Sequence, residues 1–206
     1  MADFDIKPAS GTGNSLRLKN EAGNIVLSTN NGTGASSWGA VAPAGTVVNV
    51  QQAVFKGNYS DGTADTWKDL SNGSGNELKV TTATPLNSSS KFLIRVNLGA
   101  VFIDDASNIV YFRILRDSTA VGVGDDAGSR IPCYGAFRGA YKEDINGCGP
   151  FSMEYLDSPS SSSAIVYKAQ WRINGSTFYA NYAKADSDSS HFPRAISTIT
   201  VTEIAG

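Results

Sequence analysis

Apolar and polar residues alternate along much of the chain with a period of two, which is typical of β-strands. The clearest run covers residues 91–104, and residues 109–116 and 164–173 alternate in the same way. Within the third run, Lys168, Gln170 and Arg172 point away from the apolar face, as in an antiparallel sheet with one buried side. The apolar face predicted for the first run consists of Phe92, Ile94, Val96, Leu98, Ala100 and Phe102.

Weaker β patterns and turn signals fill most of the remaining chain. Asn174-Gly175 stands between two alternating runs, as in a tight hairpin. No window of ten or more residues combines helical apolar spacing with helix caps. The pattern therefore predicts an all-β domain, with short strands in an antiparallel β-sandwich or jelly roll. The weaker strands are expected at 47–55, 66–70, 77–84, 150–156, 177–182 and 197–204.

The first forty or so residues have a different pattern, which predicts a small β-hairpin followed by a loose stretch at 30–45. A two-stranded hairpin alone is unstable in water, so its apolar side needs a partner. That partner is either the main domain or the same hairpin of other subunits. We therefore predict an attachment and trimerisation segment at 1–45 and a jelly-roll knob at 46–206. The expected contact residues are Phe4, Ile6, Leu16, Leu18, Ile25, Leu27 and Trp38, with Trp38 filling a groove of a neighbouring domain or subunit.

Composition excludes several classes of protein. Lys plus Arg is 17 and Asp plus Glu is 19, a net charge of −2, whereas a general nucleic-acid binder needs a basic surface. The chain has no apolar run of the length that a transmembrane helix needs, so we expect no membrane insertion. The opening Met-Ala-Asp-Phe-Asp-Ile lacks the basic and apolar segments of a secretory signal.

Candidate chemistry is sparse, and we expect no catalytic residue, no metal and no cofactor. A Ser-His-Asp site would have to use His191, the single histidine, which lies in a polar, loop-like stretch. Acidic pairs such as Asp125-Asp126 lack the spacing of a calcium loop. Cys133 and Cys148 are too few for a structural zinc site, and they are either reduced or joined as a disulfide.

Several stretches resemble a β module that is frequent in tailed bacteriophages, especially marine and cyanobacterial ones. The resemblance begins with Gly-Thr-Val-Val-Asn-Val-Gln-Gln at 45–52 and continues through Trp67, Leu-Lys-Val at 78–80 and Thr-Pro-Leu-Asn-Ser-Ser-Ser-Lys-Phe-Leu-Ile at 84–94. Residues 155–170 and the ending 197–205 extend it, and residues 6–27 are similar to short connector pieces found ahead of such modules. The pair Cys133 and Cys148 departs from the family pattern.

The resemblance implies a non-enzymatic virion structural protein, assembled in the host cytoplasm. Its expected fold is a tumour-necrosis-factor-like jelly roll, and its expected state is a homotrimer in a fibre, head fibre or capsid decoration. The expected partners are other copies of the chain and phage capsid or tail proteins. The alternative is a tail-fibre module that binds a bacterial surface glycan for host recognition. An enzyme acting on polysaccharide is a distant third reading.

Overall fold

The computed structural model describes residues 42–73, 75–138 and 147–206, together with the turn at 21–22 and the backbone of three short strands between 17 and 38. These residues form strands, turns and loops, and none of them lies in a helix. The predicted all-β class is therefore confirmed. Within the same ranges, no helix has the length and hydropathy needed to span a membrane.

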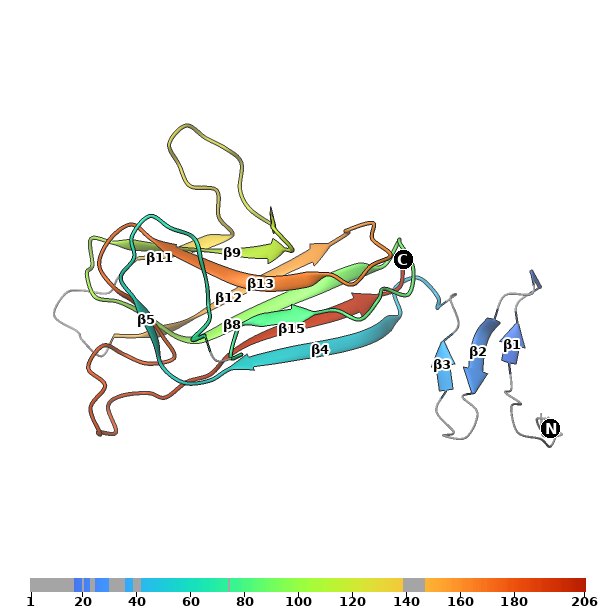
Figure 1. Cartoon of the computed structure of the whole chain (residues 1–206), viewed down its shortest axis with the longest axis horizontal. Helices are drawn as coiled ribbons and strands as arrows, with labels where there is room; N and C mark the ends of the chain where they lie inside the picture. The colour runs from blue at the N-terminus through green and yellow to red at the C-terminus, as the bar shows by residue number, and fades with distance from the viewer. Residues whose placement is uncertain are drawn as a thin grey trace.

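Two antiparallel sheets make up the main domain (Figure 1). The first, named here the β8 sheet, contains β4 (Val47–Phe55), β5 (Tyr59–Asp61), β8 (Lys91–Ile103), β12 (Gly149–Asp157), β14 (Phe178–Ala180) and β15 (Ser197–Ile204). The second, the β9 sheet, contains β6 (Lys68–Asp69), β7 (Lys79–Thr81), β9 (Ile109–Arg116), β10 (Thr119–Val121), β11 (Gly135–Arg138) and β13 (Val166–Ile173).

The order of the strands is that of a jelly roll. The β8 sheet reads β4-β15-β8-β12, with β14 and β5 continuing one end, and the β9 sheet reads β6 and β7, then β13, β9, and finally β10 and β11. The chain crosses repeatedly from one sheet to the other, and its first long strand, β4, ends up beside its last, β15. Two Greek keys wound in this way form the predicted fold, an antiparallel jelly-roll sandwich.

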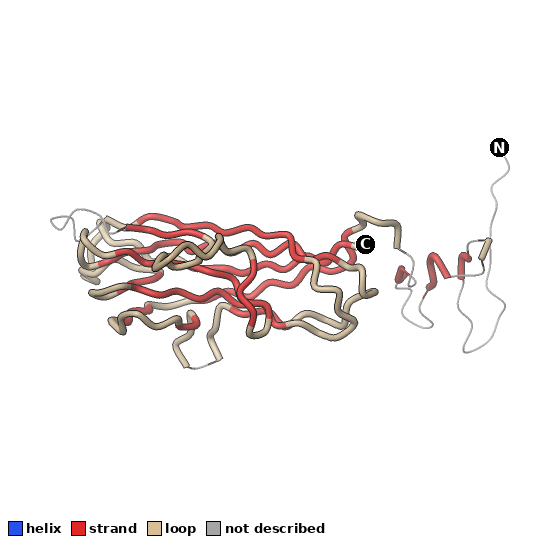
Figure 2. Tube along the Cα trace, turned by 90° about the horizontal axis from the view of Figure 1, so that it is seen from above, coloured by secondary structure: helices blue, strands red, loops and turns tan. Residues whose placement is uncertain are grey.

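Both ends of the sandwich lie together at one pole. The Gly45 N–H donates to the Ala205 carbonyl at 2.7 Å, and the Ala205 N–H donates to the Thr46 carbonyl at 2.8 Å. Viewed at right angles to Figure 1, the strands of the sandwich run lengthwise, with loops at the pole away from the C-terminus (Figure 2). The far loops therefore lie at the pole opposite to the C-terminus.

The space between the two sheets is filled mainly by aromatic and branched side chains. Trp171, Tyr167 and Phe178 are fully buried, and the rings of Trp171 and Phe178 lie 4.7 Å apart between centroids. Phe112 stacks on Phe151 at 4.4 Å, which joins the β9 sheet to β12. Aromatic pairs of this kind contribute about 1 kcal/mol beyond the area that they bury. The predicted core position of Trp171 is confirmed.

A β-bulge in β8 corrects the predicted apolar face of this strand. Gly149 and Phe151 of β12 pair with Val101 and Leu98, so β8 carries one extra residue between these positions. Because a bulge shifts the alternation by one residue, Val101 and Ile103 join the core after Leu98. Phe102, predicted on the core face, packs instead against Tyr179, with ring centroids 5.6 Å apart.

The N-terminal segment contains three strands, where the sequence pattern predicted two. β1 (Arg17–Lys19), β2 (Ile25–Thr29) and β3 (Ser36–Trp38) form an antiparallel sheet in that order. The predicted loose stretch at 30–45 is therefore wrong in part, because β3 lies within it. The polar pair Ser36-Ser37 gives no alternation that would reveal this strand.

Candidate assembly surface

At the β4 edge of the sandwich, two amide side chains bridge the gap between the two sheets. The Gln51 side chain of β4 donates to the Thr81 carbonyl at 3.2 Å and accepts from the Ala83 N–H at 3.0 Å. Asn76 repeats this pattern on Lys56, donating to its carbonyl at 2.5 Å and accepting from its N–H at 3.3 Å. Each amide thus makes the two hydrogen bonds that the backbone of a neighbouring strand would make, and so links β4 to the β6–β7 region. An edge that is closed in this way is a poor site for adding a further strand.

The opposite edge is partly covered by Tyr134. Strand β12 lies at the margin of the β8 sheet, and the Glu154 N–H of this strand donates to the Tyr134 hydroxyl at 3.0 Å. The ring of Tyr155, also in β12, packs over Gly122, where an added Cβ would come within 2.7 Å of it. Because both edges are engaged by side chains, the outer faces of the sheets are the better candidates for contact with other molecules.

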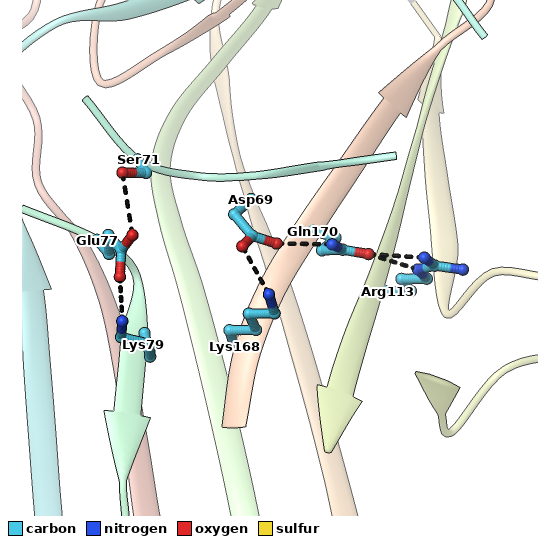
Figure 3. A network of polar contacts seen from close by, with 7 residues as sticks. All are labelled: Asp69, Ser71, Glu77, Lys79, Arg113, Lys168 and Gln170. Carbon is cyan, nitrogen blue, oxygen red and sulfur yellow. Dashed lines mark hydrogen bonds and ion pairs between the residues drawn. The ribbon is translucent and has the colours of Figure 1, made fainter. Parts of the chain in front are cut away.

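The outer face of the β9 sheet is covered by a chain of polar contacts (Figure 3). Lys168 and Gln170 of β13 both donate to the Asp69 carboxylate at 2.6 Å, and Arg113 of β9 donates to the Gln170 carbonyl oxygen at 2.7 and 2.9 Å. The Arg113 guanidinium also lies 4.1 Å from the ring centroid of Trp67. Burial lowers the pKa of Arg113, and the nearby Asp69 opposes that shift. The charged groups of this face therefore already have partners within the same chain.

The outer face of the β8 sheet has a different composition. Residues that are directly opposite on neighbouring strands form three rows across β4, β15, β8 and β12. Within these rows the only charged residues are Arg95 and Glu154, which form an ion pair with each other. The rows are Val54-Thr198-Asn97-Ser152, Gln52-Thr200-Arg95-Glu154 and Val50-Thr202-Leu93-Leu156.

All five large apolar side chains that are exposed in the described part of the chain belong to this face. Val50 and Val54 alternate with Gln52 along β4, and Val47 pairs with the outward-facing Ile204. Ile196 lies just before β15, two residues from Thr198, and therefore faces the same outward side. Exposed apolar residues that are gathered on one face make that face a candidate interaction surface. The exposed fractions are Val47 55%, Val50 57%, Val54 38%, Leu156 48% and Ile196 52%. We call these residues the assembly face.

Sequence reasoning missed the assembly face because valines in a predicted strand are normally assigned to the core. The residues that it did predict lie in the N-terminal segment. Their register sets Leu18 opposite Leu27, and Leu27 opposite Trp38, across the three strands, and Ile25 pairs with Lys19. Phe4, Ile6 and Leu16 lie outside the described residues. The roles of all seven residues in attachment and trimer contact stay predictions.

The candidate chemical groups lie on turns and loops rather than on strands. His191 is exposed, and its backbone N–H contacts the Ser189 hydroxyl. In the described ranges, no group of three or more His, Cys, Asp and Glu residues could hold a metal ion. Cys133 and Cys148 are not joined in a disulfide. Burial raises the pKa of the Cys133 thiol, which favours its protonated, less reactive form.

Compared with known proteins, the chain matches no protein-family model and no curated protein sequence.

Proposed function

We propose that the protein is a non-enzymatic structural protein that works as a homotrimer and is displayed on the surface of a phage particle. The observation that carries the assembly part of the proposal is the gathering, on one face of the β8 sheet, of all five large apolar side chains that are exposed among the described residues. The outer face of the β9 sheet, by contrast, is covered by charged and polar side chains that are paired within the chain. In a ring of three, each subunit contacts its two neighbours through different surface regions, and both regions can belong to one broad face when that face lies at the threefold axis.

The size of the assembly face supports a role for the N-terminal strands as well. Full burial of a valine or leucine side chain contributes about 1.5–3 kcal/mol, and side chains that are already half buried contribute about half of this. Five of them contribute about 4–7 kcal/mol, which only matches the lower estimates of the cost of association. A second contact in the same chain acts at high effective concentration and adds the remainder. We assign that contact to residues 1–45.

The virion role is supported by the sequence resemblance to phage β modules. It is also supported by the jelly-roll geometry, in which β4 begins beside the C-terminal residues and the loops of the other pole remain free. Rigid scaffolds with exposed loops are commonly used for display and recognition. In this proposal the N-terminal segment attaches to the particle and knits the trimer, and the sandwich projects from it.

Charge on the assembly face tests the proposal. In Val50→Asp and Val54→Asp, carboxylates replace apolar contacts, and we expect the trimer mass in sedimentation velocity to fall towards that of one chain at micromolar concentration. The matched control is Ala136→Asp, at an exposed position on β11 of the β9 sheet, and it should retain the wild-type mass. Equal masses for all three variants would overturn the assignment of this face. Immunogold labelling of intact particles tests the virion role, and particles that carry no label contradict it.

A further inference from the structure

A cavity of about 260 Å³ opens at the β12 margin of the β8 sheet, on the side of the sheet away from β4. It lies between the outward-facing ends of two cross-strand pairs and the Tyr134 side chain. Its lining residues are Arg95, Asn97, Tyr134, Ser152, Met153 and Glu154. Most of these residues are on the long strands β8 and β12, and sites built on strands hold their geometry better than sites built on loops.

The lining holds several hydrogen-bonding groups that are not used within the described part of the chain. Arg95 contacts the Glu154 carboxylate only through Nε, which leaves both terminal nitrogens as donors. Asn97 accepts from the Ser152 hydroxyl at 2.9 Å, but its own amide nitrogen has no acceptor among the described residues. The Tyr134 oxygen accepts from the Glu154 N–H at 3.0 Å, and its O–H proton has no acceptor there either. The second Glu154 oxygen, Oε1, remains as an acceptor.

We propose that this cavity is a subsite for a neutral saccharide. The hydroxyl groups of a sugar each donate and accept, so they match a site that combines several donors with one carboxylate acceptor. A ligand carboxylate would gain no net charge attraction, because Arg95 is already paired with Glu154, whose own carboxylate would repel it. The aromatic ring of Tyr134 adds an apolar surface next to its polar hydroxyl. The site would make the displayed sandwich a receptor-binding module in addition to a structural one.

The position of the cavity is compatible with assembly through β4. Three of the five exposed apolar residues, Val47, Val50 and Val54, lie on β4 at the opposite margin of the same sheet. Leu156, a fourth, lies on β12 only two residues from Glu154, so the cavity opens on the same outer face of the sheet. A contact between copies that is centred on β4 has to stop short of the β12 margin for a saccharide to enter. The saccharide inference therefore requires that the contact between copies be centred on β4, and the two proposals are tested by different readouts.

Saturation-transfer NMR on the full-length protein tests the inference, with the methyl pyranosides of glucose, galactose, mannose and rhamnose as probes. We expect saturation transfer to at least one of them, and at least about ten-fold weaker binding in Arg95→Ala and Asn97→Ala, since one lost hydrogen bond of about 1.4 kcal/mol is worth ten-fold. The matched control is Lys91→Ala, an exposed change on the same strand outside the cavity lining, which should bind within about two-fold of wild type.

Three results would overturn the inference. One is the absence of transfer to all four pyranosides from folded wild-type protein. Another is unchanged binding in Arg95→Ala and Asn97→Ala, which would place the sugar elsewhere. The third is tighter binding of methyl glucuronide than of the glucoside, which would contradict the assignment to a neutral ligand. Val50→Asp should keep the wild-type transfer signal, so a failure of assembly and a failure of this site are distinguishable.

Discussion

The buried amide of Asn181 ties together three separate segments of the sandwich. It is 1% exposed, and its nitrogen donates to the carbonyls of Phe55 and Gly57, each at 3.1 Å. Its oxygen accepts from the Ser197 hydroxyl at 2.6 Å. The backbone of Asn181 has φ 70°, a left-handed conformation that asparagine tolerates better than most residues. The residue therefore joins the end of β4, the end of β14 and the start of β15.

The substitution Asn181→Ala should lower the free energy of unfolding by about 4 kcal/mol. Three partner groups lose a hydrogen bond at about 1 kcal/mol each, and a left-handed alanine adds about 1 kcal/mol. Asn181→Gly loses the same three bonds but accepts the backbone conformation, so it should be less destabilising than Asn181→Ala. Ser197→Ala removes one of the bonds, with an expected loss of about 1 kcal/mol, and remains measurable if Asn181→Ala fails to fold.

Urea unfolding followed by circular dichroism measures these losses as shifts of the midpoint at constant slope. All variants should be compared at one protein concentration, because association adds to the apparent stability. A loss below about 1 kcal/mol for Asn181→Ala would refute the hydrogen-bond argument. A larger loss for Asn181→Gly than for Asn181→Ala would refute the backbone argument.

Three further perturbations probe the same core. A Cβ at Gly99 would lie 2.3 Å from a backbone oxygen ahead of β15, so Gly99→Ala should lower Tm by about 5 °C, whereas Gly124→Ala, in open space, should leave it unchanged. Tyr167→Phe removes a 2.7 Å hydrogen bond to the buried Asp157 carboxylate and should cost about 2 kcal/mol in urea unfolding; no measurable loss would contradict this. Burial raises the pKa of Tyr59 from 10.0 to about 12, so the stability that its proton confers is complete below pH 10 and is lost as the pH rises towards 12. In Tyr59→Phe, this alkaline decline in unfolding free energy should be smaller, and an equal decline would count against it.

The long strands could be predicted from the sequence because a period of two persists through them. The predicted run at 91–104 corresponds to β8 at Lys91–Ile103, and the predicted strands at 109–116, 47–55 and 197–204 have the observed bounds. The short strands β5, β10 and β11 have only three or four residues. So few residues give no recognisable alternation, and tertiary pairing alone defines them.

Which face of a strand lies inside was harder to predict. In β4 the pattern offers apolar and polar residues on both sides, and the structure turns Ala53 and Phe55 inward with Gln51. Gln51 belongs on that side because its amide closes the sandwich edge against the backbone at 81–83. Val50 and Val54 are consequently left outside. The assembly face thus depends on a long-range hydrogen bond that no local pattern reveals.

The most direct test of the account is the mass of the wild-type protein in solution. Light scattering coupled to size-exclusion chromatography at micromolar concentration should give three times the chain mass of 21.7 kDa. A single species of 21.7 kDa would contradict the central claim that exposed valines on the β8 sheet join copies of the chain.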